Sequence, residues 1–205
     1  MKSGLKPDAV VLVATTKALK MHGGVKKEDL GSENVDAVTS GCKNLERHIE
    51  NIGKFGVPVI VAINDYVTDT QKEHAAIIDY CKNIGVECKI SSHWEKGGKG
   101  AADLAEEVAK IADSNSANFK TLYDNKLSLW DKTQYIAQNI YGAANIIADK
   151  KIRNQFQKLE DDGFGEYPIC MAKTQYSFST DPVSYTHLRA HETRHDLVCR
   201  LLLEK

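Results

Sequence analysis

Residues 57–64 read V-P-V-I-V-A-I-N, and this stretch decides the fold class. An apolar run rich in β-branched residues, with no alternating polar positions, is typical of a strand covered on both faces, as in a parallel sheet. Residues 8–14, D-A-V-V-L-V-A, repeat the pattern. Shorter runs at residues 87–91 and 169–172 are weaker strand candidates.

Helices are predicted between these strands. Apolar residues spaced three and four apart form a stripe from Val35 to Ile52, and Gly53 is the expected left-handed stop. Thr70 and Glu73 have the spacing of a capping box, which starts a helix that should end at Gly85. Three further stripes predict helices through Leu104, Val108 and Ile111, through Leu129, Thr133, Ile136 and Ile140, and through Ile152, Phe156 and Leu159.

This alternation of strand and helix predicts an α/β fold. Parallel strands need crossover connections, which are usually helices, so we expect a parallel sheet with flanking helices. The chain has 205 residues with 42% hydrophobic and 27% charged, as in globular proteins. A net charge of −1 gives no indication of a nucleic-acid partner. No apolar run approaches the roughly 20 residues that span a bilayer.

The cysteines and the first residues indicate a cytoplasmic protein. The five cysteines are odd in number and have no C-x-x-C spacing, so we expect neither disulfides nor a structural metal site. Residues 1–4, M-K-S-G, lack the apolar stretch of a signal peptide. We therefore expect a reduced, cytoplasmic chain without a metal site or a membrane partner.

The ends of the two strongest strands are the candidate site. In open parallel sheets, ligands bind beyond the carboxyl ends of the strands. Lys17, Lys20, His22 and Asn64 would lie on this rim, where lysines can stabilise charge on phosphoryl oxygens. Each residue also has an ordinary interpretation. A lysine at a strand end is commonly a solvated charge, and Asn64 could either cap the next turn or contact a nucleotide base.

A glycine-rich stretch forms the second candidate. The glycines at 97, 98 and 100 would allow an anion to approach the backbone closely, and they open onto a helix expected at Ala101. A tight turn would explain the same glycines. Trp94, just before them, could pack in the fold or stack on a ligand.

Residues 13–24 read V-A-T-T-K-A-L-K-M-H-G-G. This resembles a signature of formate–tetrahydrofolate ligases, V-A-T-[IV]-R-A-L-K-x-[HN]-G-G, with Thr16 in place of an aliphatic residue and Lys17 in place of arginine. Lysine keeps the charge but loses the two-pronged donor geometry of arginine. The resemblance spans residues 2–182, and the other blocks that carry it lie at residues 61–64, 68–70, 94–100, 140–143 and 168–177.

The resemblance implies a P-loop-class ligase of one-carbon metabolism. Family members join formate to tetrahydrofolate with ATP and Mg²⁺ through formyl phosphate, giving 10-formyltetrahydrofolate, and the full-length protein would be a homo-oligomer. The candidate roles are catalysis by Lys17, Lys20 and His22, nucleotide or phosphate binding by Thr15, Gly23, Gly24, Asn64, Gly97, Gly98 and Gly100, and substrate contact by Trp94, Lys173, Gln175 and Tyr176.

The phosphate loop of this class, G-x-x-x-x-G-K-[ST], is absent from the sequence. The resemblance also implies that the aromatic residues around the folate ring are encoded downstream of Pro182. We therefore expect a P-loop-NTPase-like fold that is truncated at both ends, with the phosphate loop encoded upstream and the folate pocket downstream, and an inactive 205-residue chain. Two alternatives remain open on the residues alone. One is a different P-loop-class ATPase, such as a ParA/MinD-like partitioning protein, and the other is a non-catalytic interaction module.

The last residues have a different character. Residues 183–193, V-S-Y-T-H-L-R-A-H-E-T, and 196–205, D-L-V-C-R-L-L-L-E-K, are what the two ends of a common sequencing adapter encode in one frame. We expect residues 1–182 to be the ligase-like α/β region and residues 183–205 to be a foreign, disordered tail. The alternative is an amphipathic helix with Leu197, Arg200 and Leu201 on one face.

Overall fold

The computed structural model describes residues 4–171. Three candidate substrate residues, Lys173, Gln175 and Tyr176, and the expected tail at residues 183–205 lie outside this part of the chain. The described residues divide into two compact units, with residues 4–120 in unit 1 and residues 121–171 in unit 2.

Unit 1 contains a parallel three-stranded sheet, as the apolar runs predict. The strands are β1 (Val10–Ala14), β2 (Val59–Asn64) and β3 (Cys88–Ser91), and they lie in the order β1-β2-β3. Ala14 pairs with Ile63, and Asn64 pairs with Ser91. The carboxyl ends of all three strands therefore lie next to one another at one edge of the sheet, which we call the rim.

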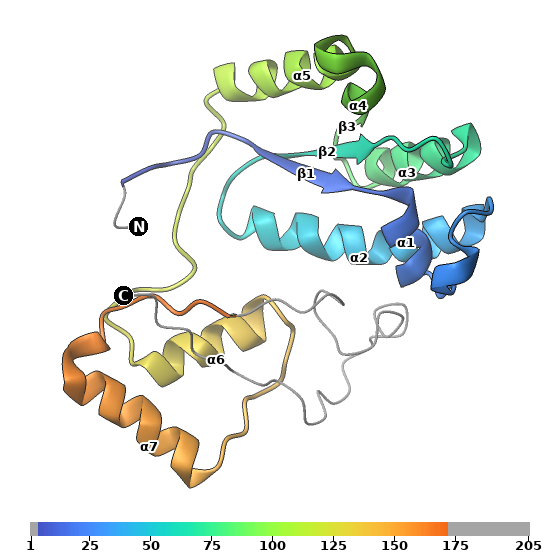
Figure 1. Cartoon of the computed structure of the whole chain (residues 1–205). Coiled ribbons are helices and arrows are strands. Elements are labelled where there is room, and N and C mark those ends of the chain that lie inside the picture. Colours follow the sequence, from blue (N-terminus) through green and yellow to red (C-terminus); the bar gives the residue numbers. More distant parts are fainter. Residues whose placement is uncertain (1–3, 172–205) are drawn as a thin grey trace. The chain divides into compact units, whose positions relative to one another are not determined.

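Helices cover both faces of this sheet. Figure 1 shows the long α2 on one side of the strands and α5 on the other. The core between the sheet, α2 and α3 includes the fully buried Val38, Cys42, Ile63 and Ile77. The helices are α1 (Thr16–His22), α2 (Val35–Gly53), α3 (Gln71–Asn83), α4 (His93–Lys96) and α5 (Ala102–Asp113), with 3₁₀ turns η1 (Lys27–Asp29) and η2 (Gly97–Ala101).

The helix boundaries follow local signals, with one correction. The capping box of Thr70 and Glu73 is present, and Gly85 has the left-handed φ of 76° that ends α3. The prediction for Gly53 is wrong, because Gly53 is the last helical residue of α2. Gly56 supplies the left-handed turn instead, with a φ of 70°. Its carbonyl accepts a hydrogen bond from the N–H of Asn118, which holds the turn in place.

Two glycines allow α1 to lie directly against α2. A Cβ atom at Gly23 would overlap the carbonyl of Ala37, and a Cβ atom at Gly41 would overlap the carbonyl of Leu19. Any side chain at either position would force the backbones apart. The backbones of α1 and α2 therefore approach each other directly at these two points.

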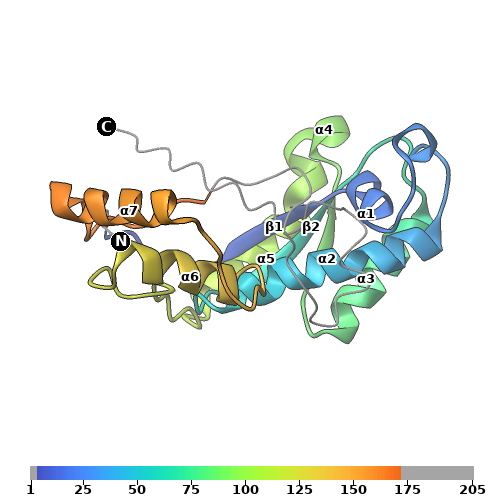
Figure 2. The same ribbon diagram turned by 90° about the horizontal axis from the view of Figure 1, so that it is seen from below.

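Unit 2 consists of α6 (Leu129–Asn139), α7 (Lys150–Leu159) and the turn η3 (Glu160–Phe164). Figures 1 and 2 both show α6 and α7 side by side. Trp130 contacts Phe156 edge to face at 5.5 Å between ring centroids. The guanidinium of Arg153 lies 4.4 Å from the ring centroid of Trp130 on the same pair of helices. The two apolar stripes that predict these helices are confirmed.

The strand predicted at residues 169–172 is not formed by residues 169–171. The N–H of Ile169 donates instead to the hydroxyl of Tyr123 at 2.9 Å, which satisfies the backbone without a neighbouring strand. The remaining residue of the run, Ala172, lies outside the described range. Among residues 4–171, no helix combines the length and the apolar character needed to cross a membrane.

Candidate functional site

The first turn of α1 brings Lys17 to the rim. Thr15 follows β1 and caps α1, because its Oγ1 accepts a hydrogen bond from the N–H of Ala18 at 3.2 Å. Lys17 then extends over the ring of Tyr66, with 5.5 Å between Nζ and the ring centroid. An ammonium group over an aromatic face is a cation–π contact. Thr15 thus has a structural role here, and its predicted phosphate contact stays a prediction.

Asn64 and Tyr66 join the same cluster from the end of β2. The side-chain Nδ2 of Asn64 donates to the Tyr66 hydroxyl at 3.2 Å. Tyr66 is 46% exposed, so its ring is available beside the lysine charge. The structure therefore unites Lys17 and Asn64, as expected, through a residue that the sequence analysis missed. An aromatic residue two positions after the end of β2 was the signal that could have drawn attention to it.

Lys20 does not lie open at the rim. Its side chain is 0% exposed, and its Nζ lies 3.0 Å from Oε1 of the equally buried Glu73. It also donates to the carbonyl of Ser32 at 2.9 Å. Burial opposes ionisation of Glu73, but hydrogen bonds from Asn34, Lys20 and Thr70 hold its pKa below the usual 4.5. The expected exposed position of Lys20 is thus corrected, because the fold supplies a buried counter-ion; its catalytic role stays a prediction.

The end of the family-like block is buried as well. His22 is buried in the last turn of α1. Gly23 lies against α2, and Gly24 adopts a left-handed φ of 94°. Close packing and the turn explain both glycines in the absence of a ligand. Their predicted role in phosphate binding is not excluded by this packing and stays a prediction.

The glycine-rich stretch is a 3₁₀ turn, not an open loop. Gly97 has a left-handed φ of 58°, and a Cβ atom at Gly100 would overlap the carbonyl of Ser92. The following helix α5 begins at Ala102, where no side chain caps its first turn. Backbone packing accounts for Gly100, and nothing within 4 Å would meet a Cβ at Gly98.

Trp94 presents its indole ring to solvent. It is 89% exposed on α4, directly after β3, so it does not have the packing role that was its ordinary interpretation. Because β2 and β3 are paired neighbours, Tyr66 and Trp94 both follow strands that end at the rim. Exposed aromatic faces beside a lysine ammonium can bind a flat heteroaromatic ligand that carries negative charge.

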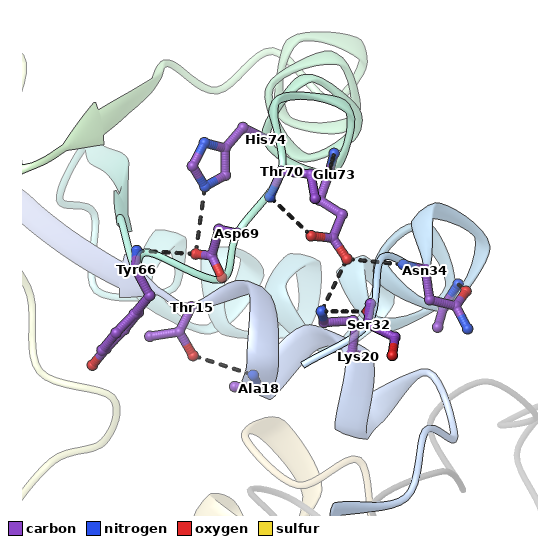
Figure 3. A network of polar contacts seen from close by, with 11 residues as sticks. Thr15, Ala18, Lys20, Ser32, Asn34, Tyr66, Asp69, Thr70, Glu73 and His74 are labelled. Carbon is purple, nitrogen blue, oxygen red and sulfur yellow. Dashed lines mark hydrogen bonds and ion pairs between the residues drawn. The ribbon is translucent and has the colours of Figure 1, made fainter. Parts of the chain in front are cut away.

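One group of described residues has metal-ligating atoms close together. Ligand atoms of Asp65, Asp69 and His74 lie within 4.8 Å of one another, just after β2. Figure 3 shows that one oxygen of Asp69 already contacts the His74 ring, at 3.5 Å, and the N–H of Tyr66, at 3.2 Å. The donor set includes an imidazole, whereas Mg²⁺ prefers oxygen ligands and substrate phosphates. These residues therefore do not fit Mg²⁺.

Comparison with known protein families identifies the region. The model of the family described as formate–tetrahydrofolate ligase matches residues 1–197. A formate–tetrahydrofolate ligase of Granulibacter bethesdensis is 56% identical over 180 residues, which are 88% of this chain and 32% of that protein. That of Ruegeria pomeroyi is 56% identical over 181 residues, with the same shares covered.

A third relative extends the match along this chain. A formate–tetrahydrofolate ligase of Pelagibacter ubique is 51% identical over 199 residues, covering 97% of this chain and 35% of its own length. The chain thus spans about a third of the length of the curated relatives it matches. These identities do not favour the partitioning ATPase or the interaction module as alternatives.

Proposed function

The chain belongs to the formate–tetrahydrofolate ligase family, and on this premise we propose that the rim of unit 1 holds tetrahydrofolate, which departs from the expectation of a pocket encoded after Pro182. The protein to which it corresponds would join formate to tetrahydrofolate with ATP, through formyl phosphate, and release 10-formyltetrahydrofolate. The family relationship and the printed names of the relatives support this activity.

A single observation carries the proposal for this region. An exposed aromatic face at Trp94 and the cluster of Lys17, Asn64 and Tyr66 all lie at or just beyond the carboxyl ends of paired parallel strands. Tetrahydrofolate combines a flat pterin ring with a negatively charged glutamate. Ring stacking on an aromatic side chain and attraction to Lys17 suit those two parts.

Lys17 has a second possible partner within the same reaction. Its ammonium group is positively charged. Such a charge stabilises a phosphoryl group during its transfer, and it also stabilises the formyl phosphate that forms when the phosphoryl group reaches formate. Lysine binds such a group as a point charge, without the two parallel hydrogen bonds of arginine. Lys17 is therefore the residue that we propose to contact the reacting phosphate.

ATP is part of the proposal for the whole protein, whereas this chain lacks the phosphate-loop motif in its sequence. We expect the 205-residue chain by itself neither to hydrolyse ATP nor to form 10-formyltetrahydrofolate, because phosphoryl transfer needs several charged groups placed around the nucleotide at once. No step is assigned to Mg²⁺, since the described donor set does not suit it. A homo-oligomeric, cytoplasmic protein is proposed on the family resemblance.

Fluorescence can test the binding proposal, because the chain has two tryptophans. Trp94 lies in unit 1 and Trp130 in unit 2. We expect tetrahydrofolate to quench the fluorescence of a Trp130→Phe variant, in which Trp94 is the reporter. The matched Trp94→Phe variant, with Trp130 as its reporter, should show no saturable quenching.

The control ligand is a pterin-free molecule, N-benzoylglutamate, which keeps the acidic end. It should quench Trp94 weakly or not at all if ring stacking dominates. Saturable quenching of Trp130 alone, or none at Trp94 up to millimolar tetrahydrofolate, would contradict a folate site at this rim.

A further inference from the structure

The ion pair between Lys20 and Glu73 lies behind the rim and not in it. Both side chains are 0% exposed, so neither charge is open to a ligand from solvent. Lys20 comes from the last turn of α1, and Glu73 comes from the first turn of α3. The pair therefore joins the element that follows β1 to the element that follows β2.

The carboxylate of Glu73 accepts three hydrogen bonds from three different segments. Oε1 accepts from Nζ of Lys20 and from the N–H of Asn34 at 2.9 Å, and Oε2 accepts from the N–H of Thr70 at 3.1 Å. Figure 3 shows these contacts converging on one side chain. Asn34 in turn caps α2. One carboxylate thus holds the end of α1 and the starts of α2 and α3.

Both residues of the ion pair are close in sequence to residues of the rim. Lys17 lies one helical turn before Lys20 on α1, and Tyr66 lies in the loop that runs to Thr70. In that loop, the N–H of Tyr66 donates to Asp69, which directly precedes Thr70. A shift of α1 against this loop would move the Lys17 ammonium relative to the Tyr66 ring.

We propose that Lys20 and Glu73 are positioning residues, which fix α1 against the loop at residues 65–70 so that Lys17 stays over Tyr66. Lys20 itself contacts no ligand. An apolar contact could fill the same space, but it would not impose one relative position, whereas an ion pair with several directed hydrogen bonds does. The consequence for tetrahydrofolate binding rests on the proposed function, and the consequence for the geometry of the rim does not.

Hydrogen exchange at single amides tests the geometric part directly. The variant Glu73→Gln should speed exchange at Tyr66 about tenfold or more, because the loop loses its anchor. Since that variant leaves Lys20 buried without a counter-ion, a second variant, Lys20→Met with Glu73→Leu, replaces both charges by apolar groups. It should keep the protection of the Ile60 to Ile63 amides in β2 while Tyr66 still exchanges about tenfold faster.

The chain offers a matched control in the pair Lys72 and Glu33. This pair also joins α3 to the segment before α2, at 3.3 Å, but its side chains are solvent-exposed. The variant Lys72→Met with Glu33→Leu should leave exchange at Tyr66 unchanged. If Lys20→Met with Glu73→Leu also left Tyr66 at its native rate, the pair would be merely structural and the proposal would be wrong.

Two further measurements separate this proposal from the folate proposal. Acylation of surface amines should label Lys72 and leave Lys20 unlabelled, with or without tetrahydrofolate, and equal labelling of the two would overturn the assignment. In the Trp130→Phe background, the doubly apolar variant should weaken tetrahydrofolate binding about fivefold or more. If the native chain shows no quenching, the folate proposal fails, and the exchange experiment still decides the positioning role.

Discussion

Each unit contains a buried lysine, and the two lysine ammonium groups have different kinds of hydrogen-bond partner. Lys20 in unit 1 and Lys132 in unit 2 are both fully buried. Lys20 has a carboxylate partner at 3.0 Å. The Nζ of Lys132 donates to two backbone carbonyls, those of Gly165 and Tyr167, and the described residues place no carboxylate within ion-pair distance of it. Unit 1 thus neutralises its buried charge, whereas unit 2 only solvates it with peptide dipoles.

The two kinds of partner affect the pKa values of Lys132 and Glu73 differently. Burial lowers the pKa of Lys132 from its usual 10.5, and the more distant charges of Glu160, Glu166 and Asp124 oppose this only in part. In unit 1 the hydrogen bonds to Glu73 outweigh its burial, so the ionised pair is the preferred form. A counter-ion thus favours a charged interior in unit 1, whereas the pKa of Lys132, which has only carbonyl partners, is lowered by burial.

The largest effect should follow removal of the counter-ion. Glu73→Gln leaves Lys20 charged and unpaired in the interior, which costs about 3–5 kcal/mol of stability in unit 1. The protection of β2 amides against hydrogen exchange measures this loss. A change below about 1 kcal/mol would mean that Lys20 escapes to solvent, and the contrast between the two units would then disappear.

A smaller loss is expected at Lys132→Met. The carbonyls of Gly165 and Tyr167 lose their donor, at a cost of about 1–3 kcal/mol, but the cost of burying a charge is removed as well. The packed ring of Trp130 reports the urea midpoint of unit 2 by fluorescence. Lys151→Met, an exposed lysine of the same unit, is the control and should leave the midpoint unchanged. A loss as large as that for Glu73→Gln would show that carbonyls and a carboxylate are equivalent partners.

Acid should act on unit 1 through Glu73. Because its pKa is lower in the folded chain, its contribution to stability is complete above the usual 4.5 and is lost as the pH falls through the folded value. Protection of β2 amides should therefore decline below about pH 4.5, and less so in the doubly apolar variant. An identical acid dependence in both proteins would assign the effect to other carboxylates.

Raising the pH should stabilise unit 2, whereas lowering the pH should destabilise unit 1. The folded chain holds the proton of Lys132 less tightly than the unfolded chain, so unfolding takes up a proton between the lowered pKa and 10.5. The stability of unit 2 should rise with pH across that window, as measured by the urea midpoint at Trp130. The Lys132→Met variant should lack this rise.

The smallest effect on stability is expected at the rim. Lys17→Met removes a half-exposed cation–π contact with Tyr66, worth about 0.5–1 kcal/mol. The same change should weaken tetrahydrofolate binding at Trp94 several-fold, because the charge faces the proposed ligand. Equal and small losses in stability and binding would place Lys17 outside the site. This comparison distinguishes Lys17, proposed to contact the ligand, from Lys20 and Lys132, which are buried in the fold.

The fold was largely predictable, because its signals are local. The apolar runs at residues 57–64 and 8–14 needed no distant partner to be assigned as parallel strands. The capping box of Thr70 and Glu73 was equally readable, since its spacing lies within one turn. The sequence did not predict that the same Glu73 also pairs with Lys20, far away along the chain. Lys20 was accordingly expected at the open rim.

The helix α1 and the exposure at the rim were harder to predict for a physical reason. Residues 15–24 carry few apolar positions, so their helical periodicity is weak, and no helix was predicted there. Its shape depends on Gly23 and Gly41, which matter only once α1 and α2 meet. Tyr66 was missed because a lone aromatic residue in a loop does not reveal whether its ring is covered. Such properties arise from tertiary contacts.

The reciprocal glycine contact between α1 and α2 has a consequence for how this region tolerates change over time. Because carbonyl groups, and not side chains, fill the space at Gly23 and Gly41, no compensating substitution across the interface can make room for a larger residue at either position. We therefore expect both positions to accept only glycine. Substitution near the rim is instead open at exposed positions that make no such backbone contact, such as Val67 in the loop after β2.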